Sequence, residues 1–560
     1  MSERTRVLLM LTVAMLIYAN TLQHSFVFDD EIYITGNRQV THPSLRLLFS
    51  AVTNNHFRPL TFAAFVLETR IGGWQPFVFH LISILLHAAV TLLLYLVVRK
   101  LFESVPKAGL VAFAAALLFA VHPIHSEVVD WASAQSELLA AGFLLAAWLA
   151  HLHGRPLVAL LCFVLALLSK ESAVAFLPLL MIGDYLRHKF SPAIHYLGMA
   201  VGTIAYFPLL WLVQGRHFQH AMYFLDNPLA YLPIQWRILN ALRIAWKYVG
   251  LQLYPGTLSC DYSYNAIVLY MKWGHVLFAV MATAVVVGLW VWVMYRRKTE
   301  WALAGAIYFA GFAVTANLVL PTGTIMGERL AYFPSAGFCV LMAVVWSRLE
   351  RHRPELAWAL LAIAVLTLGG RTVVRNWDWR SDYTLFSAGV RAVPGSSKMH
   401  ADLGIANYYL GRLGPARQEL ETAIHIYPDL PQGVAYLGLV EAGEGRDEEA
   451  RRTLEKAVAM TPRADFNYRV FSVILAAQLI KLNKDDEALR FLIPVIAEWP
   501  DYSRAWYNRA LIEFRRGETS NARKDLETAL RLEPTYGQAQ QLLRALNASA
   551  GPPKETASPH

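Results

Sequence analysis

The chain holds a series of long apolar runs, and no other feature constrains its fold so strongly. Several approach the ~20 residues that a helix needs to cross the hydrocarbon of a bilayer, while those between 137 and 186 are shorter. A mean hydropathy of +0.36 is too high for a soluble protein of 560 residues. The sequence therefore predicts an all-α, polytopic transmembrane bundle of about eleven spans. The runs lie at 6–22, 77–98, 108–121, 137–150, 156–168, 171–186, 195–213, 273–294, 302–320, 331–347 and 355–370.

Basic residues fall at every second connection between these runs, as the positive-inside rule requires of a chain with a cytoplasmic N-terminus. The net charge of +9 thus reflects membrane topology and does not indicate a nucleic-acid partner. The other connections, and everything after residue 371, are expected on the extracytoplasmic face. The basic segment 237–252 would be costly as a lipid-facing span, so we expect an amphipathic helix at the outer interface. The basic groups are Arg4/Arg6, Arg99/Lys100/Lys107, Arg155, Arg187/Lys189, Arg296/Arg297/Lys298 and Arg348/Arg351/Arg353.

From about residue 397 the apolar runs give way to a repeat. Prolines end successive units at spacings of 34, 38 and 34 residues, and each has an alanine twelve positions earlier. Small residues where helices touch, with a proline after each second helix, are typical of the tetratricopeptide pattern. We expect about four repeats over 397–547, stacked into an α-solenoid with a concave groove, and a disordered tail at 548–560. The prolines are Pro428, Pro462, Pro500 and Pro534, and the alanines are Ala416, Ala450, Ala488 and Ala522.

An acidic pair, Asp29-Asp30, follows the first apolar run within the sequence FVFDDEIYITGN. One interpretation is a helix N-cap, in which an aspartate accepts backbone N–H bonds at the end of a span. The other is a general base at the bilayer surface that deprotonates an acceptor hydroxyl, with or without a divalent cation such as Mg²⁺ or Mn²⁺. The pair alone does not decide between them. If a metal binds, Asp29 and Asp30 are its expected ligands.

Further polar groups gather in the second and third outer connections. His122, His125 and Glu127 lie within HPIHSE, where metal ligation is one interpretation, but the intervening proline argues against a regular helical ligand face. Buried, hydrogen-bonded histidines are the other. Lys170-Glu171 lies between two short runs, either as a local ion pair or as an anchor for a phosphate or an acidic partner.

Arginines complete the set of candidates on this face. Arg329 follows Glu328 at the start of a run, within PTGTIMGERLAYFPSAG, and Arg58 precedes the second run. An arginine at a bilayer boundary can simply extend its guanidinium to water. It is also the natural partner of a lipid phosphate, which it can bind with two hydrogen bonds. Carboxylates and arginines on one face therefore favour chemistry on a lipid-linked substrate.

Several motifs together resemble one family. They are FVFDD, HPIHSE, LSKES, DNP at 226–228, LSCDYS at 258–263, and ERLAYFPSAG followed by WRSDYTLF at 379–386. In order and spacing they are similar to the transmembrane and tetratricopeptide-repeat-containing O-mannosyltransferases and their bacterial relatives. The resemblance implies the GT-C class, which consists of multi-span inverting glycosyltransferases that use a polyprenyl-phosphate sugar.

The resemblance also implies roles for particular residues. Asp29 and Asp30 match the acidic pair of the first outer loop that serves as catalytic base. Glu127 matches the acid of the second outer loop, and Arg329 matches an arginine that engages the donor phosphate. The chain departs from the family at 134–139, which reads AQSELL where relatives often read Gly-Arg-x-Asp-Leu-Leu. If the arginine replaced by Gln135 contacts donor or acceptor, the sugar need not be mannose.

The sequence thus predicts a transferase domain at 1–390 followed by the repeat domain. We expect transfer of mannose or another hexose from a polyprenyl phosphate to a hydroxyl, on protein, with Lys170 assisting Arg329 at the phosphate. The repeat groove is expected to bind the acceptor protein. A bacterial inner membrane is the expected location, with the repeats in the periplasm. Two alternatives remain open, a non-catalytic membrane scaffold built on the repeats and a transferase that acts on a glycan or lipid.

Overall fold

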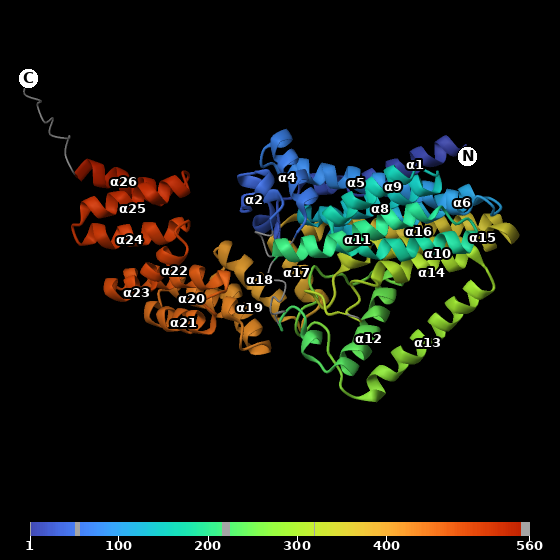
Figure 1. Cartoon of the computed structure of the whole chain (residues 1–560). Coiled ribbons are helices and arrows are strands. Elements are labelled where there is room, and N and C mark those ends of the chain that lie inside the picture. The colour runs from blue at the N-terminus through green and yellow to red at the C-terminus, as the bar shows by residue number, and fades with distance from the viewer. Residues whose placement is uncertain (1, 51–56, 215–223, 319, 550–560) are drawn as a thin grey trace, which may run out of the picture. The chain divides into compact units, whose positions relative to one another are not determined.

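The computed structural model describes residues 2–50, 57–214, 224–318 and 320–549. These residues form helices joined by turns and loops and contain no β-strand, which confirms the all-α class. The chain divides into two compact units, Met1–Lys398 and Met399–His560. The first unit contains the apolar runs and the second contains the repeats (Figure 1).

The apolar runs of the first unit form helices that lie side by side (Figure 1). Small residues fill the centre of this bundle. Helix α14 (Thr299–Phe312) and helix α15 (Tyr332–His352) approach so closely that a Cβ on Gly337 would lie 2.5 Å from the backbone nitrogen of Tyr308. Such close backbone contact is how helices associate in a bilayer. Their neighbours are α1 (Glu3–Leu16), α5 (Pro76–Leu101), α6 (Ala108–Ala120), α8 (Gln135–Leu152), α9 (Pro156–Ser169), α10 (Phe176–Arg187), α11 (Ala193–Gln214) and α16 (Pro354–Asn376), while α13 (Trp273–Tyr295) diverges from them.

The number of full-length spans is smaller than expected. Among the described residues, seven helices are long and apolar enough to cross a membrane, or eight if the bent pair Ala108–Ala120 and Pro123–Asp130 is one span. The expected eleven are therefore not confirmed. Helices α9, α10 and α14 have only 12 to 14 residues, which at 1.5 Å per residue span ~18–21 Å of a ~30 Å hydrocarbon layer. An apolar run can extend beyond the end of its helix: α14 ends at Phe312, whereas the run continues to residue 320.

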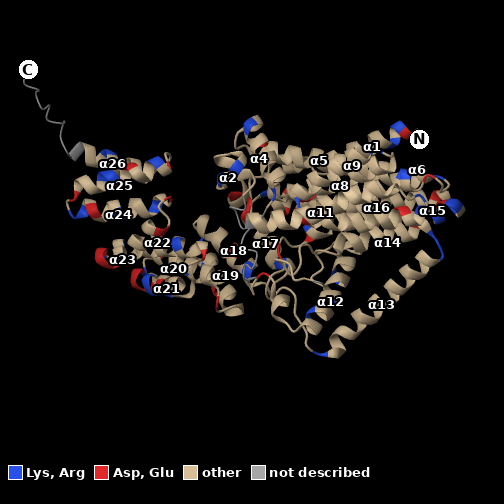
Figure 2. Ribbon diagram, in the orientation of Figure 1, with Lys and Arg blue, Asp and Glu red and all other residues tan. Residues whose placement is uncertain are grey.

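The basic connections predicted to be cytoplasmic meet at one end of the bundle. Figure 2 shows that charged residues of this unit gather at the helix ends and leave the middle of the bundle nearly free of charge. Ion pairs link one basic connection to another, which places these connections together as the positive-inside pattern predicts. The links are Lys107 to Glu350 at 2.7 Å, Lys189 to Glu103 at 2.8 Å, Arg348 to Glu300 at 3.0 Å, and Arg99 to Glu3.

The connections at the opposite end carry short helices and the predicted site residues. The segment expected to be an interfacial helix forms α12 (Ile234–Leu253), which is not among the candidate spans. Its cations stack on aromatic rings of the following loop, with Arg243 4.3 Å from the ring of Tyr270 and Lys247 4.8 Å from that of Tyr262. The other short elements are α4 (Pro59–Gly72), α7 (Ser126–Asp130), and α17 (Asp382–Ala392), which follows the last span.

The second unit is a stack of helix pairs, as the repeat predicts. The turns between paired helices contain Gly411, Gly445 and Gly517, each at a φ of +72° to +79° that favours glycine. The third repeat has Asn483 at a φ of +58° instead of a glycine, and asparagine tolerates the same left-handed conformation. The pairs are α18 (Ser397–Tyr409) with α19 (Leu413–Ile426), α20 (Pro431–Gly443) with α21 (Asp447–Met460), α22 (Phe466–Lys481) with α23 (Asp485–Glu498), and α24 (Ser503–Arg515) with α25 (Thr519–Leu532), followed by α26 (Gly537–Ser549).

Cysteine labelling tests the expected topology. In a chain whose three native cysteines are replaced by alanine, we introduce Ser520→Cys in the repeats or Lys298→Cys in a basic connection, both exposed positions. A membrane-impermeant maleimide should label Ser520→Cys in intact spheroplasts. It should label Lys298→Cys only after the membrane is opened. Labelling of Lys298→Cys but not Ser520→Cys in intact spheroplasts would reverse the orientation.

Candidate active site

Asp30 is a structural anchor of the first outer connection, the segment between α1 and α4. Its carboxylate is fully buried and accepts hydrogen bonds from the backbone nitrogen of Ser133 at 2.9 Å, the hydroxyl of Ser133 at 2.6 Å and the backbone nitrogen of Val27 at 3.1 Å. Burial raises the pKa of Asp30 to about 7, and these three donors oppose that rise by favouring the ionised form. Asp30 thereby ties the first outer connection to the second.

The residue before the pair is held in an unusual backbone conformation. Phe28 has a φ of +58°, which is rare for a bulky side chain, and Asp382 of α17 accepts a 2.8 Å hydrogen bond from its backbone nitrogen. The ring of Phe28 packs against Trp131, with ring centroids 5.3 Å apart. The backbone of Phe28 is held by Asp382 and its ring by Trp131. These two contacts fix the direction of the next side chain, that of Asp29.

Asp29 differs from its neighbour in having no partner. Its carboxylate is half-buried and makes no hydrogen bond or ion pair within the described part of the chain. Burial raises the pKa of Asp29. The cations of Lys398 and Arg329 lower this pKa, and the carboxylates of Asp261 and Asp226 raise it. A carboxylate with a raised pKa and no occupied lone pair is what a general base requires.

Lys398 balances the carboxylates around Asp29. Its ammonium lies 3.3 Å from Asp226, 3.8 Å from Asp261 and 5.8 Å from the centre of the Phe28 ring. The lysine is the last residue of the first unit and lies in the first turn of α18. Without it, three carboxylates would repel one another in a partly desolvated space.

Three ion pairs form a layer beside Asp29. Glu127, fully buried, accepts bonds from both the guanidinium and the backbone nitrogen of Arg329, the latter at 2.8 Å. Lys170 pairs with Glu137, and Arg58 binds Glu171 through two nitrogens at 2.8 Å and 3.2 Å. The pairs are mutually close, because Lys170 interacts electrostatically with Arg58, Glu171, Arg329 and Glu127. We refer to these six residues as the ion-pair layer.

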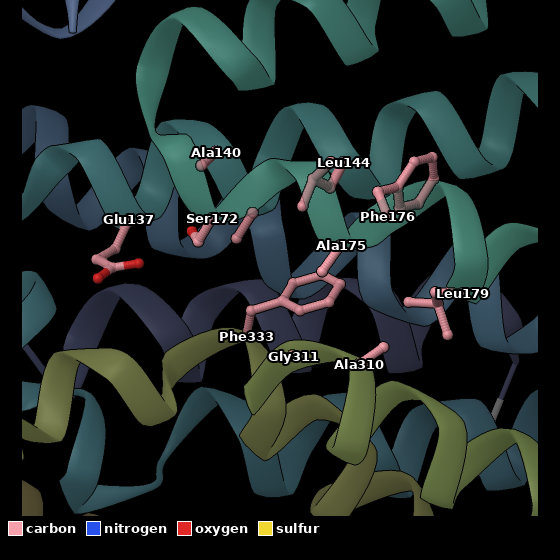
Figure 3. A pocket seen from close by; sticks show the side chains of 11 residues that line it. Glu137, Ala140, Leu144, Ser172, Ala175, Phe176, Leu179, Ala310, Gly311 and Phe333 are labelled. Atoms are coloured by element: carbon pink, nitrogen blue, oxygen red, sulfur yellow. The ribbon is translucent and has the colours of Figure 1, made fainter. Parts of the chain in front are cut away.

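An apolar pocket leads away from this layer into the bundle. Glu137 and Ser172 lie at one end of it, and Phe176 and Leu179 lie farther along (Figure 3). The remaining lining side chains are small or apolar and come from α8, the 3₁₀ turn Glu171–Ala175, α14 and α15. They are Ala140, Ala141, Leu144, Ala175, Ala310, Gly311 and Phe333. The pocket has a volume of about 30 Å³, so its walls must move apart to admit a hydrocarbon chain.

The histidines of the second outer connection are buried and hydrogen-bonded inside the protein. His122 accepts a bond at Nδ1 from the backbone nitrogen of Ile124 at 3.2 Å, so its Nε2 carries the proton that it donates to the carbonyl of Gln252 at 3.0 Å. His125 contacts the hydroxyl of Ser335 at 2.7 Å. Across the described residues, no group of three or more His, Cys, Asp or Glu is arranged to hold a metal ion.

Glu328 supports the loop that carries Asp261. It is buried, and its carboxylate accepts bonds from the backbone nitrogen of Ser259 at 2.6 Å and the hydroxyl of Tyr262 at 2.7 Å. These contacts hold the loop that carries Asp261. Sequence reasoning did not single out Asp226, Asp261 or Lys398 as site residues. The two aspartates do lie within motifs that carry the family resemblance, DNP and LSCDYS, whereas nothing in the sequence marks Lys398.

Gln135 and Glu137, within the segment 134–139 where the chain departs from the family motif, have defined hydrogen-bond or ion-pair partners. Gln135 is fully buried and donates to Glu68 at 3.2 Å, to the hydroxyl of Ser83 at 3.2 Å and to the carbonyl of Phe79 at 3.1 Å. Glu137, in place of an aspartate, supplies the carboxylate that pairs with Lys170. The glutamine therefore contributes to packing under the site, and the glutamate belongs to the ion-pair layer.

Comparisons with known proteins agree with the family resemblance. The chain is 27% identical to protein O-mannosyl-transferase TMTC3 of Mus musculus over 94% of this chain and 64% of that protein. It is 29% identical to protein O-mannosyl-transferase F38B6.6 of Caenorhabditis elegans over 76% of this chain and 63% of that protein. The chain thus spans a little under two thirds of the length of these relatives. A family model described as tetratricopeptide repeat matches residues 503–536. Among solved structures, YrrB, a TPR protein with an unusual peptide-binding site, is 15% identical and covers 36% of this chain with a TM-score of 0.25.

The two aspartates should differ in their effect on stability. Asp30→Asn replaces an oxygen acceptor with an amide nitrogen that cannot accept a bond from Val27 or Ser133, which should cost about 1–3 kcal/mol. Asp29→Asn is the matched control and should not lower the free energy of unfolding, since Asp29 has no hydrogen-bond partner to lose and its buried charge is unfavourable. Thermal denaturation of the detergent-solubilised chain measures both. Equal losses in the two variants would refute this division of roles.

Proposed function

We propose that the chain is an integral-membrane, inverting glycosyltransferase that moves a hexose from a polyprenyl phosphate to a hydroxyl of a protein acceptor. The observation that carries the proposal is the unpartnered carboxylate of Asp29 close to Arg329, beside an apolar pocket that begins at the ion-pair layer. A base next to an anion-binding group, near a small apolar pocket that can widen between helices, fits a lipid-linked sugar. The names of the relatives support a sugar transfer to protein.

In this mechanism Asp29 removes the proton from the acceptor hydroxyl. The oxygen attacks the anomeric carbon of the sugar from the face opposite the phosphate, and the bond from that carbon to the phosphate oxygen breaks. The polyprenyl phosphate leaves with the electron pair, and the configuration at the anomeric carbon inverts. Arg329 neutralises the charge that grows on the phosphate, and Lys170 adds positive charge nearby.

The other predicted residues take supporting parts. Asp30 holds the first outer connection through its three hydrogen bonds and is fully buried, away from a substrate. Glu127 orients Arg329 by accepting from its side chain and backbone. A divalent cation has no step in this mechanism, because the oxygens of Asp30 are occupied by protein donors and Asp226 and Asp261 already share Lys398.

The second unit suits a role in acceptor binding. A tetratricopeptide solenoid usually binds extended polypeptide, which raises the local concentration of acceptor near a transferase. A bacterial inner membrane, with Asp29 facing the periplasm, agrees with the basic connections at the opposite end of the bundle. A pure scaffold accounts for the repeats but gives no reason for an unpartnered carboxylate of raised pKa beside an arginine.

Reconstituted transfer tests the proposal. The purified chain in liposomes receives an undecaprenyl-phosphate hexose, with mannose and glucose forms in parallel, and extracytoplasmic proteins from a strain that lacks the chain. Mass spectrometry should find peptides that gain one hexose. Asp29→Asn should reduce the rate by a factor of about 100 to 10,000, the usual contribution of a general base. The exposed neighbour variant Glu31→Gln should transfer normally. Wild-type transfer by Asp29→Asn would refute the base assignment, and sugar found only on lipid or glycan would refute the protein acceptor.

The charge on Lys398 should set the pH range of activity. Lys398 lowers the pKa of Asp29, so Lys398→Met should raise that pKa and leave less ionised base at neutral pH. The acid limb of kcat/KM against pH should therefore move to higher pH, while Lys398→Arg should keep the wild-type limb. An unshifted limb in an active Lys398→Met variant would show that Lys398 does not act on the base.

Filling the apolar pocket should discriminate between donors by chain length. Ala140→Phe places a ring near the start of the pocket and should raise KM roughly tenfold for an undecaprenyl-phosphate sugar, through overpacking against the chain. A citronellyl-phosphate sugar, which is too short to reach far into the pocket, should be affected much less. Leu161→Phe, on an exposed face of α9, is the control. Equal effects on both donors would place the lipid chain elsewhere.

A further inference from the structure

A polar hollow of about 360 Å³ lies where the last span ends and α17 begins, apart from the residues assigned to catalysis. The candidate span Pro354–Arg380 ends at this point. The hollow is lined by Trp377, Asp378, Arg380, Tyr383, Thr384, Ser387 and Arg391. A hollow at the end of a span opens at the depth of lipid headgroups.

Three lining residues occupy one face of a short amphipathic helix. Thr384, Ser387 and Arg391 are spaced by three and four residues, which places them on one side of α17. Arg380 ends the 3₁₀ turn Trp377–Arg380, before the extended Ser381, and lines the same hollow. The opposite side buries Leu385, Phe386, Ala388 and Gly389 in the first unit. The polar side therefore faces outward while the apolar side fixes the helix.

The hollow carries a net positive charge. Neither Arg380 nor Arg391 has a carboxylate partner within the described part of the chain, and both are exposed. The acidic lining residue, Asp378, is already paired with Arg375 at 2.9 Å. Two guanidinium groups and the hydroxyl of Ser387 can therefore donate to a ligand in the hollow. Such a set favours the oxygens of a phosphate.

An apolar stripe leads along α16 to the hollow. Ile363, Leu366 and Val374 are 56%, 74% and 61% exposed, and they lie with Trp377 on one helical face. Trp377 is 45% exposed, and the guanidinium of Arg380 lies 5.7 Å from its ring, so the aromatic group marks the boundary between hydrocarbon and headgroup. A soluble anion would use only the hollow, whereas a lipid would use the stripe as well.

We propose that this hollow binds the phosphate of an anionic phospholipid, with the acyl chains along the exposed stripe of α16. The lipid lies next to the catalytic connection, because Asp382 in the first turn of α17 holds the backbone of Phe28, the residue before Asp29. An anionic lipid that stabilises α17 thereby stabilises the connection that positions the base.

Native mass spectrometry of the full chain in detergent tests the proposal. Phosphatidylglycerol, phosphatidylcholine and inorganic phosphate are added separately to the wild type, to Arg380→Gln/Arg391→Gln, and to the control Arg46→Gln/Arg70→Gln. The control removes two exposed cations from the first unit. We expect the wild type and the control to retain phosphatidylglycerol at least about tenfold more tightly than phosphatidylcholine, and the hollow variant to lose that preference.

Three results would overturn the proposal. The first is an unchanged preference for phosphatidylglycerol in the hollow variant, and the second is equal retention of both lipids by the wild type. The third is displacement of phosphatidylglycerol by an equal concentration of inorganic phosphate, which would indicate a soluble ligand. Because Arg380 and Arg391 are exposed, the variant should fold. If it does not, the single variant Arg391→Glu must show the same loss of preference with an unchanged denaturation midpoint.

Discussion

The ion pair between Glu127 and Arg329 holds the centre of the site together, because a fully buried carboxylate is costly without a partner. Removing one partner from such a buried pair typically costs about 3–5 kcal/mol. The contact joins the second outer connection to the start of α15 and leaves part of Arg329 exposed. The pairs of Lys170 with Glu137 and Arg58 with Glu171 repeat this arrangement. Each therefore fixes two segments at this end of the bundle to one another.

The sequence predicted the features that depend on residue types and spacings within short stretches of the chain. The repeats follow from the proline and alanine spacings, and the shared end of the basic connections follows from residues such as Lys107 and Arg348. The family motifs also brought Asp29, Glu127 and Arg329 to one site. The different roles of Asp29 and Asp30 could not be predicted, because the partner of Asp30 is Ser133, 103 residues away. Lys398 has no marked context in the sequence. The count of eleven spans is not confirmed, because an apolar run does not reveal where its helix ends.

The division between the two aspartates links folding to chemistry. Asp30 uses its oxygens to hold the loop, so its neighbour can remain unpartnered at a fixed position. Burial without a partner is unfavourable for Asp29, and Lys398 and Arg329 reduce that cost through space. A site that keeps a strained residue such as Phe28 and an unsatisfied carboxylate gives up stability, which is typical of catalytic positions.

The central claim is that the ion-pair layer holds a lipid phosphate beside Asp29. A photo-crosslinking undecaprenyl-phosphate sugar, with a diazirine on its first isoprene unit, tests it directly in the Asp29→Asn chain, which should bind donor without consuming it. The account predicts labelled peptides from residues 169–179 or 327–333 and loss of that labelling in Asp29→Asn/Arg329→Gln. Labelling confined to α13 or to the repeats, and unchanged without Arg329, would contradict it.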